Sequence, residues 1–125
     1  MNILSVRNQQ RVHRIASREF KKAATIALEQ LFQTPSYHLS VTFVTAKRMT
    51  EVNESHLQHK GPTDIITFDY SEADVLDGEL LICPAVAVEY SQRYNVSLGR
   101  ELARYFIHGV LHLHGHDDHA PDDRR

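Results

Sequence analysis

Hydrophobic residues follow two different spacings along this chain, and the spacings predict helices and strands in turn. Between Val12 and Leu31 they recur every three or four residues, as on one face of a helix. Between Tyr37 and Thr45 every second residue is hydrophobic and β-branched residues are frequent, as in a strand. Shorter stretches of both kinds complete the chain, and the predicted order is strand 2–6, helix 12–31, strand 37–45, helix 46–57, strand 65–70, strand 78–83, helix 84–94 and helix 97–115.

This order predicts an α+β fold, in which helices pack against a small four-stranded mixed sheet. Signals at the helix ends support the assignment. Pro84 suits the first position of a helix, Ser97 suits an N-cap, and Gly115 suits a helix end. With 125 residues and no internal repeat, the chain is expected to form a single domain over residues 1–125.

The composition is that of a soluble globular protein, with 42% hydrophobic and 24% charged residues. No hydrophobic run approaches the ~20 residues that span a bilayer, so no membrane association is expected. The N-terminus lacks the hydrophobic segment of a signal peptide. Cys83 is the only cysteine, which excludes an internal disulfide; together these features indicate the cytoplasm.

Charge is distributed unevenly. Residues 1–50 carry eight Lys or Arg and two acids, whereas residues 51–125 carry six Lys or Arg and fourteen acids. A basic flank beside an acidic, histidine-rich half could steer a polyanion toward a metal. The simpler interpretation is a solvated helix face. The positive charge is concentrated in Arg7, Arg11, Arg14, Arg18, Lys21 and Lys22.

The segment with the clearest chemistry is the predicted last helix, which contains His108 and His112. Residues four apart lie on the same helix face, so both imidazoles could reach one metal ion. A turn at Gly115 would let the following loop supply a third ligand, which leaves the open fourth position of a catalytic zinc site. We therefore place a metal site at the C-terminal end of this helix.

Other residues of the same helix bear on this interpretation. The polar stripe on the same helix could simply face water; it comprises Ser97, Glu101, Arg104, His108 and His112. Gly109, however, costs a helix ~1 kcal/mol relative to alanine, which is easier to understand if something approaches closely there. Zinc peptidases carry Glu directly after the first histidine, where this chain has Gly109, so a peptidase of that type is disfavoured.

Besides the histidine segment at residues 108–118, residues 62–68 and 78–83 form two further distinctive blocks. Together the three blocks resemble the YbeY family of bacterial single-strand-specific metallo-endoribonucleases. The family signature His-Gly-x-Leu-His-Leu-x-Gly-Tyr-Asp-His resembles residues 108–118. The family block Pro-Thr-Asp-Val-Leu-Ser-Phe resembles residues 62–68, preceded by Asn53, and Gly-Asp-Ile-x-Ile-Cys resembles residues 78–83. The blocks occur in the family's order and spacing between residue 50 and about residue 119.

The resemblance implies a hydrolase that uses one Zn²⁺ ion to cut single-stranded RNA. It also implies roles in 16S rRNA 3′-end maturation and ribosome quality control, with the ribosomal small subunit as partner; DNA is not expected. His108 and His112 match the first two family ligands. The third falls on Asp118 without a gap, while His119 lies one residue later, and both stay open as metal ligands.

The main departure from the family is Leu57, which stands where the family has an arginine suited to hold RNA phosphate. His56, His59 or Lys60 could supply a substitute cation, or could belong to an ordinary polar loop. We assign His108, His112, His56 and Lys60 as the catalytic candidates. Asp69 and Glu79, near predicted strand ends, are weaker candidates as bases and fit solvated turns. A non-catalytic, metal-stabilised ribosome-associated factor and a zinc peptidase-like hydrolase are the alternatives.

Overall fold

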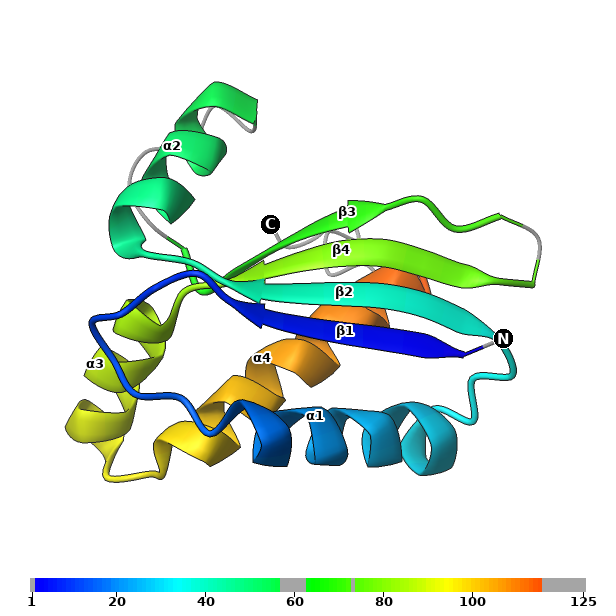
Figure 1. The fold of residues 1–125 in the computed structure, drawn as a ribbon, viewed down its shortest axis with the longest axis horizontal. Helices are drawn as coiled ribbons and strands as arrows, with labels where there is room; N and C mark the ends of the chain where they lie inside the picture. Colours follow the sequence, from blue (N-terminus) through cyan, green and yellow to red (C-terminus); the bar gives the residue numbers. More distant parts are fainter. Residues whose placement is uncertain (1, 57–62, 73, 116–125) are drawn as a thin grey trace.

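The computed structural model describes residues 2–56, 63–72 and 74–115 (Figure 1). The predicted order of strands and helices is confirmed. The first predicted helix consists of two segments, an α-helix and a π-helix. The elements are β1 (Ile3–Asn8), α1 (Ser17–Ile26), η1 (Ala27–Leu31, the π-helix), β2 (Tyr37–Phe43), α2 (Ala46–His56), β3 (Ile65–Asp69), β4 (Leu76–Ile82), α3 (Pro84–Tyr94) and α4 (Leu98–Leu113).

The strands form one four-stranded sheet in the order β1-β2-β4-β3. β1 and β4 each pair with β2 in parallel, and β3 pairs with β4 in antiparallel fashion. The predicted mixed sheet is therefore confirmed. Because side chains alternate between the faces of a strand, Leu39, Val41 and Phe43 of β2 all point to one face, where they are buried.

Helices α1 and α4 cover that face of the sheet (Figure 1). The main hydrophobic core lies between these layers and includes residues from β2, β4, α1 and α4. Phe20 of α1 joins them: its ring meets those of Phe43 and Phe106 edge-on, with ring centroids 5.0 and 5.8 Å away. Burial of such aromatic rings contributes most of the packing energy in a small core.

A smaller core lies where α2 packs at one end of the opposite face. It consists of Val44, Met49, Val52, Ile66 and Cys83. Cys83 is fully buried and packs here as a small hydrophobic residue. Over the described ranges, no helix combines the length and the hydrophobicity needed to cross a bilayer.

The predicted start of the first helix at Val12 is wrong, because α1 begins at Ser17. The cause is Gln10, whose side chain is buried. Its amide nitrogen donates to the carbonyl of His13 at 2.7 Å, and its amide oxygen accepts from the His13 N–H at 2.9 Å. These bonds stabilise a turn that competes with helix formation, and Val12 is left 76% exposed.

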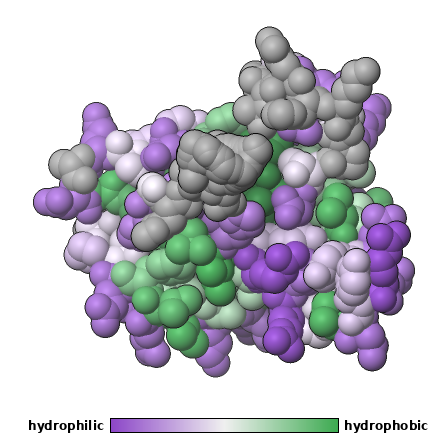
Figure 2. Space-filling view, turned by 180° about the vertical axis from the view of Figure 1, so that it is seen from behind, coloured by the Kyte–Doolittle hydropathy of each residue, from purple (hydrophilic) through white to green (hydrophobic). Residues whose placement is uncertain are grey.

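The end of the same hydrophobic stripe also differs from the prediction. Residues 27–31 form a π-helix, in which the N–H of Phe32 donates to the carbonyl of Ala27. The wider π turn rotates later residues off the α-helical stripe, and Leu31 is 64% exposed. Ile26, the last residue of α1, is also 48% exposed. On the side seen in Figure 2, hydrophobic patches interrupt the polar surface.

Candidate metal centre on the last helix

Both ends of α4 are fixed by hydrogen bonds. The Ser97 Oγ accepts from the backbone N–H of Arg100 at 3.1 Å, which confirms the predicted N-cap. At the other end, Gly115 has a φ of +84°, and its N–H donates to the carbonyl of His112 at 3.0 Å. Residues with a Cβ rarely adopt this φ, so Gly115 lets the chain turn within three residues of His112.

His108 and His112 lie side by side on α4, and both are half-buried. Their ring centroids are 5.7 Å apart and their ring planes are 29° from parallel. This is the arrangement expected for residues four apart on a helix. The structure therefore brings together the two histidines that the sequence assigned to one metal ion.

Gly109, between them, faces the sheet. A Cβ atom at this position would lie 2.6 Å from Cδ2 of Leu80 and 2.7 Å from Cδ1 of Ile65. Both distances are shorter than van der Waals contact, so only glycine lets α4 approach β3 and β4 this closely. The close approach inferred from the helical glycine is therefore made by the sheet.

The candidates for the third ligand, Asp118 and His119, lie outside the described residues, as do His116 and Asp117. Among residues 2–56, 63–72 and 74–115, no three His, Cys, Asp or Glu side chains could together hold a metal ion. That finding does not test the predicted centre, because its third ligand was placed beyond Gly115.

His114 fixes the start of the segment that would carry the third ligand. Its ring stacks on Phe32, with ring centroids 5.5 Å apart and planes 20° from parallel. Its Nε2 lies 3.3 Å from the Oγ1 of Thr34. No sequence pattern indicated this contact, because it joins residues 80 positions apart.

The suggestion that the polar stripe of α4 faces water is wrong for Glu101, which is only 2% exposed. Its carboxylate accepts hydrogen bonds from the Nε and Nη2 of Arg104. These bonds hold the pKa of Glu101 below its ordinary value, and they outweigh its burial, which acts the other way. Burial, followed by the hydrogen bond to Glu101, raises the pKa of Tyr105.

This ion pair makes a contribution to stability that depends on pH. We expect Arg104→Met to lower the free energy of unfolding by about 2 kcal/mol at pH 7, because a buried carboxylate loses its cation. This loss is smaller than for a fully buried ion pair, because solvent screens the exposed side chain of Arg104. Because the pKa of Glu101 is lower in the folded protein, the ion pair stabilises the fold fully when the pH is above the pKa of the unfolded chain, near 4.5. This stabilisation is lost as the pH falls through the folded-state pKa of Glu101. The difference between the two proteins should therefore shrink toward pH 3.5.

Urea unfolding at pH 7 and pH 3.5 measures the effect. Arg48→Met is the matched control, because Arg48 forms an exposed pair with Glu51 at 3.7 Å, which should contribute less than about 0.5 kcal/mol. An equal loss in the Arg104 variant at both pH values would show that the effect comes from packing and that the charge of Glu101 is not involved.

The remaining candidates occupy different positions. His56 is the last residue of α2, while Leu57, His59 and Lys60 lie outside the described residues. The Oδ1 of Asp69 accepts from the N–H of Ser71, which agrees with its interpretation as a turn residue.

Glu79 does not lie in a turn. It is in the middle of β4 and is half-buried, which corrects its interpretation as a solvated turn residue. The six basic residues of the N-terminal part do not share one helix face, because only Arg18, Lys21 and Lys22 are on α1. Arg7 lies on β1 instead.

The fold defines the class of protein. A solution structure of a Thermotoga maritima protein matches it with a TM-score of 0.67 and 25% sequence identity, over 98% of this chain and 80% of that chain. The chain is thus one of the small α+β proteins with this mixed sheet.

Sequence comparison identifies the family. The family model described as endoribonuclease YbeY matches residues 5–125. Endoribonuclease YbeY of Chlorobium luteolum is 36% identical over 121 residues, which cover 94% of this chain and 88% of that protein. The Bacteroides fragilis endoribonuclease YbeY is 41% identical over 86 residues, or 69% of this chain and 62% of that protein. The chain therefore belongs to the YbeY family, and the resemblance found in the sequence is confirmed.

Proposed function

We propose that this protein is a zinc-dependent endoribonuclease that cleaves single-stranded RNA. The observation that carries the proposal is the pair of stacked imidazoles on α4, with ring centroids 5.7 Å apart, within a family whose named members are endoribonucleases. In line with the family resemblance, we propose action in 16S rRNA 3′-end maturation and ribosome quality control, on the ribosomal small subunit in the cytoplasm.

The described residues fit a zinc ion in two respects. Imidazole nitrogens bind zinc at about 2.0–2.1 Å, and two nearly parallel rings at the observed separation can each direct a nitrogen to one ion. Gly115 then turns the chain so that Asp118 or His119 could complete the ligand set. When bound, Zn²⁺ supplies Lewis-acid polarisation of a phosphate oxygen and lowers the pKa of water.

The protein's own residues have simpler roles in this proposal. His108 and His112 hold the ion through neutral ring nitrogens, so their ability to bind depends on being deprotonated. His56 and Lys60 are proposed to hold the RNA phosphate in place of the family arginine, since the side chain of Leu57 can donate no hydrogen bond. Leu57 is also the feature that favours the second candidate, a non-catalytic ribosome-associated factor.

Metal analysis combined with an RNA cleavage assay tests the proposal. Purified protein should contain about one zinc ion per chain and should cut a 5′-labelled single-stranded RNA. A chelator should stop cleavage, and added Zn²⁺ should restore it. Asp118→Ala and His119→Ala distinguish the two candidates for the third ligand, because only loss of the true third ligand should lower zinc occupancy. Undiminished cleavage by metal-free protein would refute the proposal, and cleavage of casein without RNA cleavage would indicate a peptidase.

A further inference from the structure

Among residues 2–56, 63–72 and 74–115, only α2 covers part of the sheet face opposite α1 and α4, and it does so at one end (Figure 1). Strand pairing places two neighbouring rows of side chains on this face. One row contains Glu79 of β4 beside Phe68 of β3. The next contains Arg7 of β1 beside Thr42 of β2. Four residues that are distant in sequence are thereby brought to one surface.

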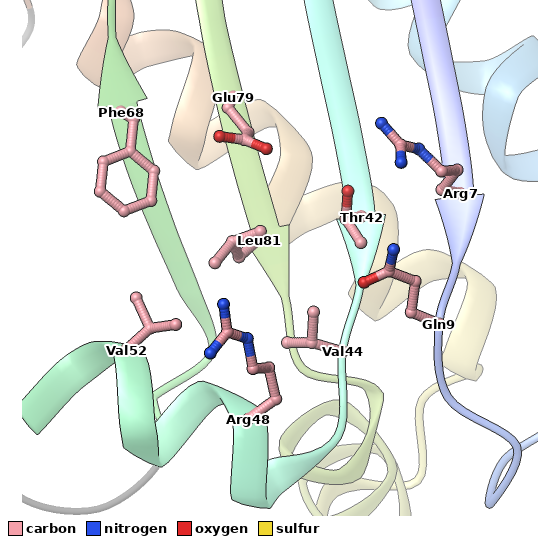
Figure 3. Close-up of a pocket in the computed structure, with 9 residues that line it drawn as sticks. All are labelled: Arg7, Gln9, Thr42, Val44, Arg48, Val52, Phe68, Glu79 and Leu81. Carbon is pink, nitrogen blue, oxygen red and sulfur yellow. The ribbon is translucent and has the colours of Figure 1, made fainter. Parts of the chain in front are cut away.

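These rows line a pocket of about 270 Å³ (Figure 3). Figure 3 shows Arg7 extending from β1 toward Thr42 and Glu79, and Arg48 reaching in from α2. Leu81 and neighbouring aliphatic side chains form the floor. The pocket thus combines two guanidinium groups, a carboxylate, a hydroxyl and an aromatic ring around a hydrophobic base.

Thr42 is the least expected member. It is 6% exposed, and in the part of the chain that the structure describes its Oγ1 has no hydrogen-bond partner. Figure 3 shows this oxygen directed into the pocket. A buried polar group without a partner destabilises a protein, and native structures contain few of them. The hydroxyl is therefore available to a ligand group that enters the pocket.

The charges around the hydroxyl point to the ligand's chemistry. Arg7 and Glu79 form no ion pair within residues 2–56, 63–72 and 74–115. Among the same residues, Arg48 forms one ion pair, the exposed pair with Glu51. Guanidinium groups bind phosphate, and a carboxylate accepts hydrogen bonds from the exocyclic amino group of a base.

We propose that this pocket binds one nucleotide of a single-stranded RNA and selects bases that carry an exocyclic amino group. The proposal rests on the proposed ribonuclease function and adds a base-selective subsite to it. Glu79 accepts from the amino group, the Thr42 hydroxyl bonds to the base edge, and Arg7 with Arg48 holds the phosphate. Uracil has no amino group and is discriminated against.

The position of β3 connects this subsite to the histidines. β3 is an edge strand. The side chain of Ile65, on one face of β3, packs against α4 at Gly109. The side chain of Phe68, on the other face, lines the pocket. The pocket and α4, the helix that carries His108, therefore lie on opposite faces of the same edge strand.

Fluorescence anisotropy with labelled octacytidylate and octauridylate tests the proposal, using the full chain as purified. We expect octacytidylate to bind about tenfold more tightly, in line with one base contact. Glu79→Gln should reduce this preference to less than about twofold, because an amide also pairs with uracil. Glu72→Gln, which makes the same charge change in an exposed turn, should leave the preference intact. Arg7→Gln should weaken both oligonucleotides equally.

Thr42→Val tests the hydroxyl separately, since valine has the same shape. It should weaken octacytidylate binding about fivefold while leaving the unfolding temperature unchanged or higher. Equal binding of the two oligonucleotides, or a Thr42→Val protein that binds like the wild type, would overturn the proposal. Gel analysis of the same samples reports cleavage. Base preference without cleavage would support the subsite and refute the ribonuclease function. Cleavage without base preference would support the ribonuclease function and refute the subsite.

Discussion

His112→Ala is expected to abolish zinc binding and RNA cleavage together. Without the second imidazole, one helical histidine and one loop residue would have to hold the ion alone. A Lewis acid contributes several kcal/mol to a reaction of this kind, so we expect cleavage to fall by about 10³-fold or more. Zinc content per chain and the initial rate of cleavage of a labelled single-stranded RNA measure the two effects.

The fold should survive this substitution. His112 is only half-buried, and alanine is the better helix former, so the circular dichroism spectrum and unfolding temperature of the metal-free proteins should agree. His13→Ala is a suitable control, since it removes an imidazole from the segment before α1. A His112→Ala protein that keeps its zinc would disprove the ligand assignment. One that loses zinc yet fully complements a deletion strain would favour the non-catalytic ribosome factor.

The arrangement of α4 could largely be predicted because its signals are local. The i,i+4 spacing of His108 and His112, the Ser97 cap and the Gly115 turn each involve residues within a few positions of one another. The same holds for Pro84, which begins α3, and for the alternation in β2. Local rules of helix capping and strand alternation settle such features.

The features that could not be predicted depend on residues far apart in sequence or on a single side chain. One buried Gln10 delays α1 by five residues relative to the prediction. The burial of Glu101 depends on how α4 packs and on Arg104. The pocket requires knowing that β2 pairs with β4 and not with β3. Before that pairing is known, Arg7, Thr42 and Glu79 are three unrelated polar residues.

Gly109→Ala, Gly78→Ala and Gly99→Ala are expected to have graded effects on stability, because the three glycines differ in what surrounds them. A Cβ at position 78 would lie 2.8 Å from the backbone oxygen of Phe68 and 3.1 Å from the Leu113 side chain. Since a backbone oxygen cannot move aside easily, we expect Gly78→Ala to cost about 3 kcal/mol. The Cβ at position 109 meets the ends of the Leu80 and Ile65 side chains, which can shift at a smaller cost.

For Gly109→Ala, overpacking of about 1–3 kcal/mol is partly offset by the ~1 kcal/mol that alanine gains in a helix. We therefore expect a net loss of about 1–2 kcal/mol. At Gly99, on the same helix, an added Cβ would meet no atom within 4 Å, so Gly99→Ala should stabilise by up to about 1 kcal/mol. Urea unfolding of the three proteins measures the series.

The comparison between positions 99 and 109 separates helix propensity from helix–sheet contact. If Gly109→Ala stabilised the protein as much as Gly99→Ala, α4 would not lie against Leu80 and Ile65 as described. In Gly109→Ala, the added Cβ should push α4 away from Leu80 and Ile65. This shift would also move His108 and His112, since they lie on the same helix on either side of Gly109. Zinc affinity of Gly109→Ala should therefore fall even though no ligand is changed, because a shift of α4 alters where both imidazoles lie relative to the loop that follows Gly115.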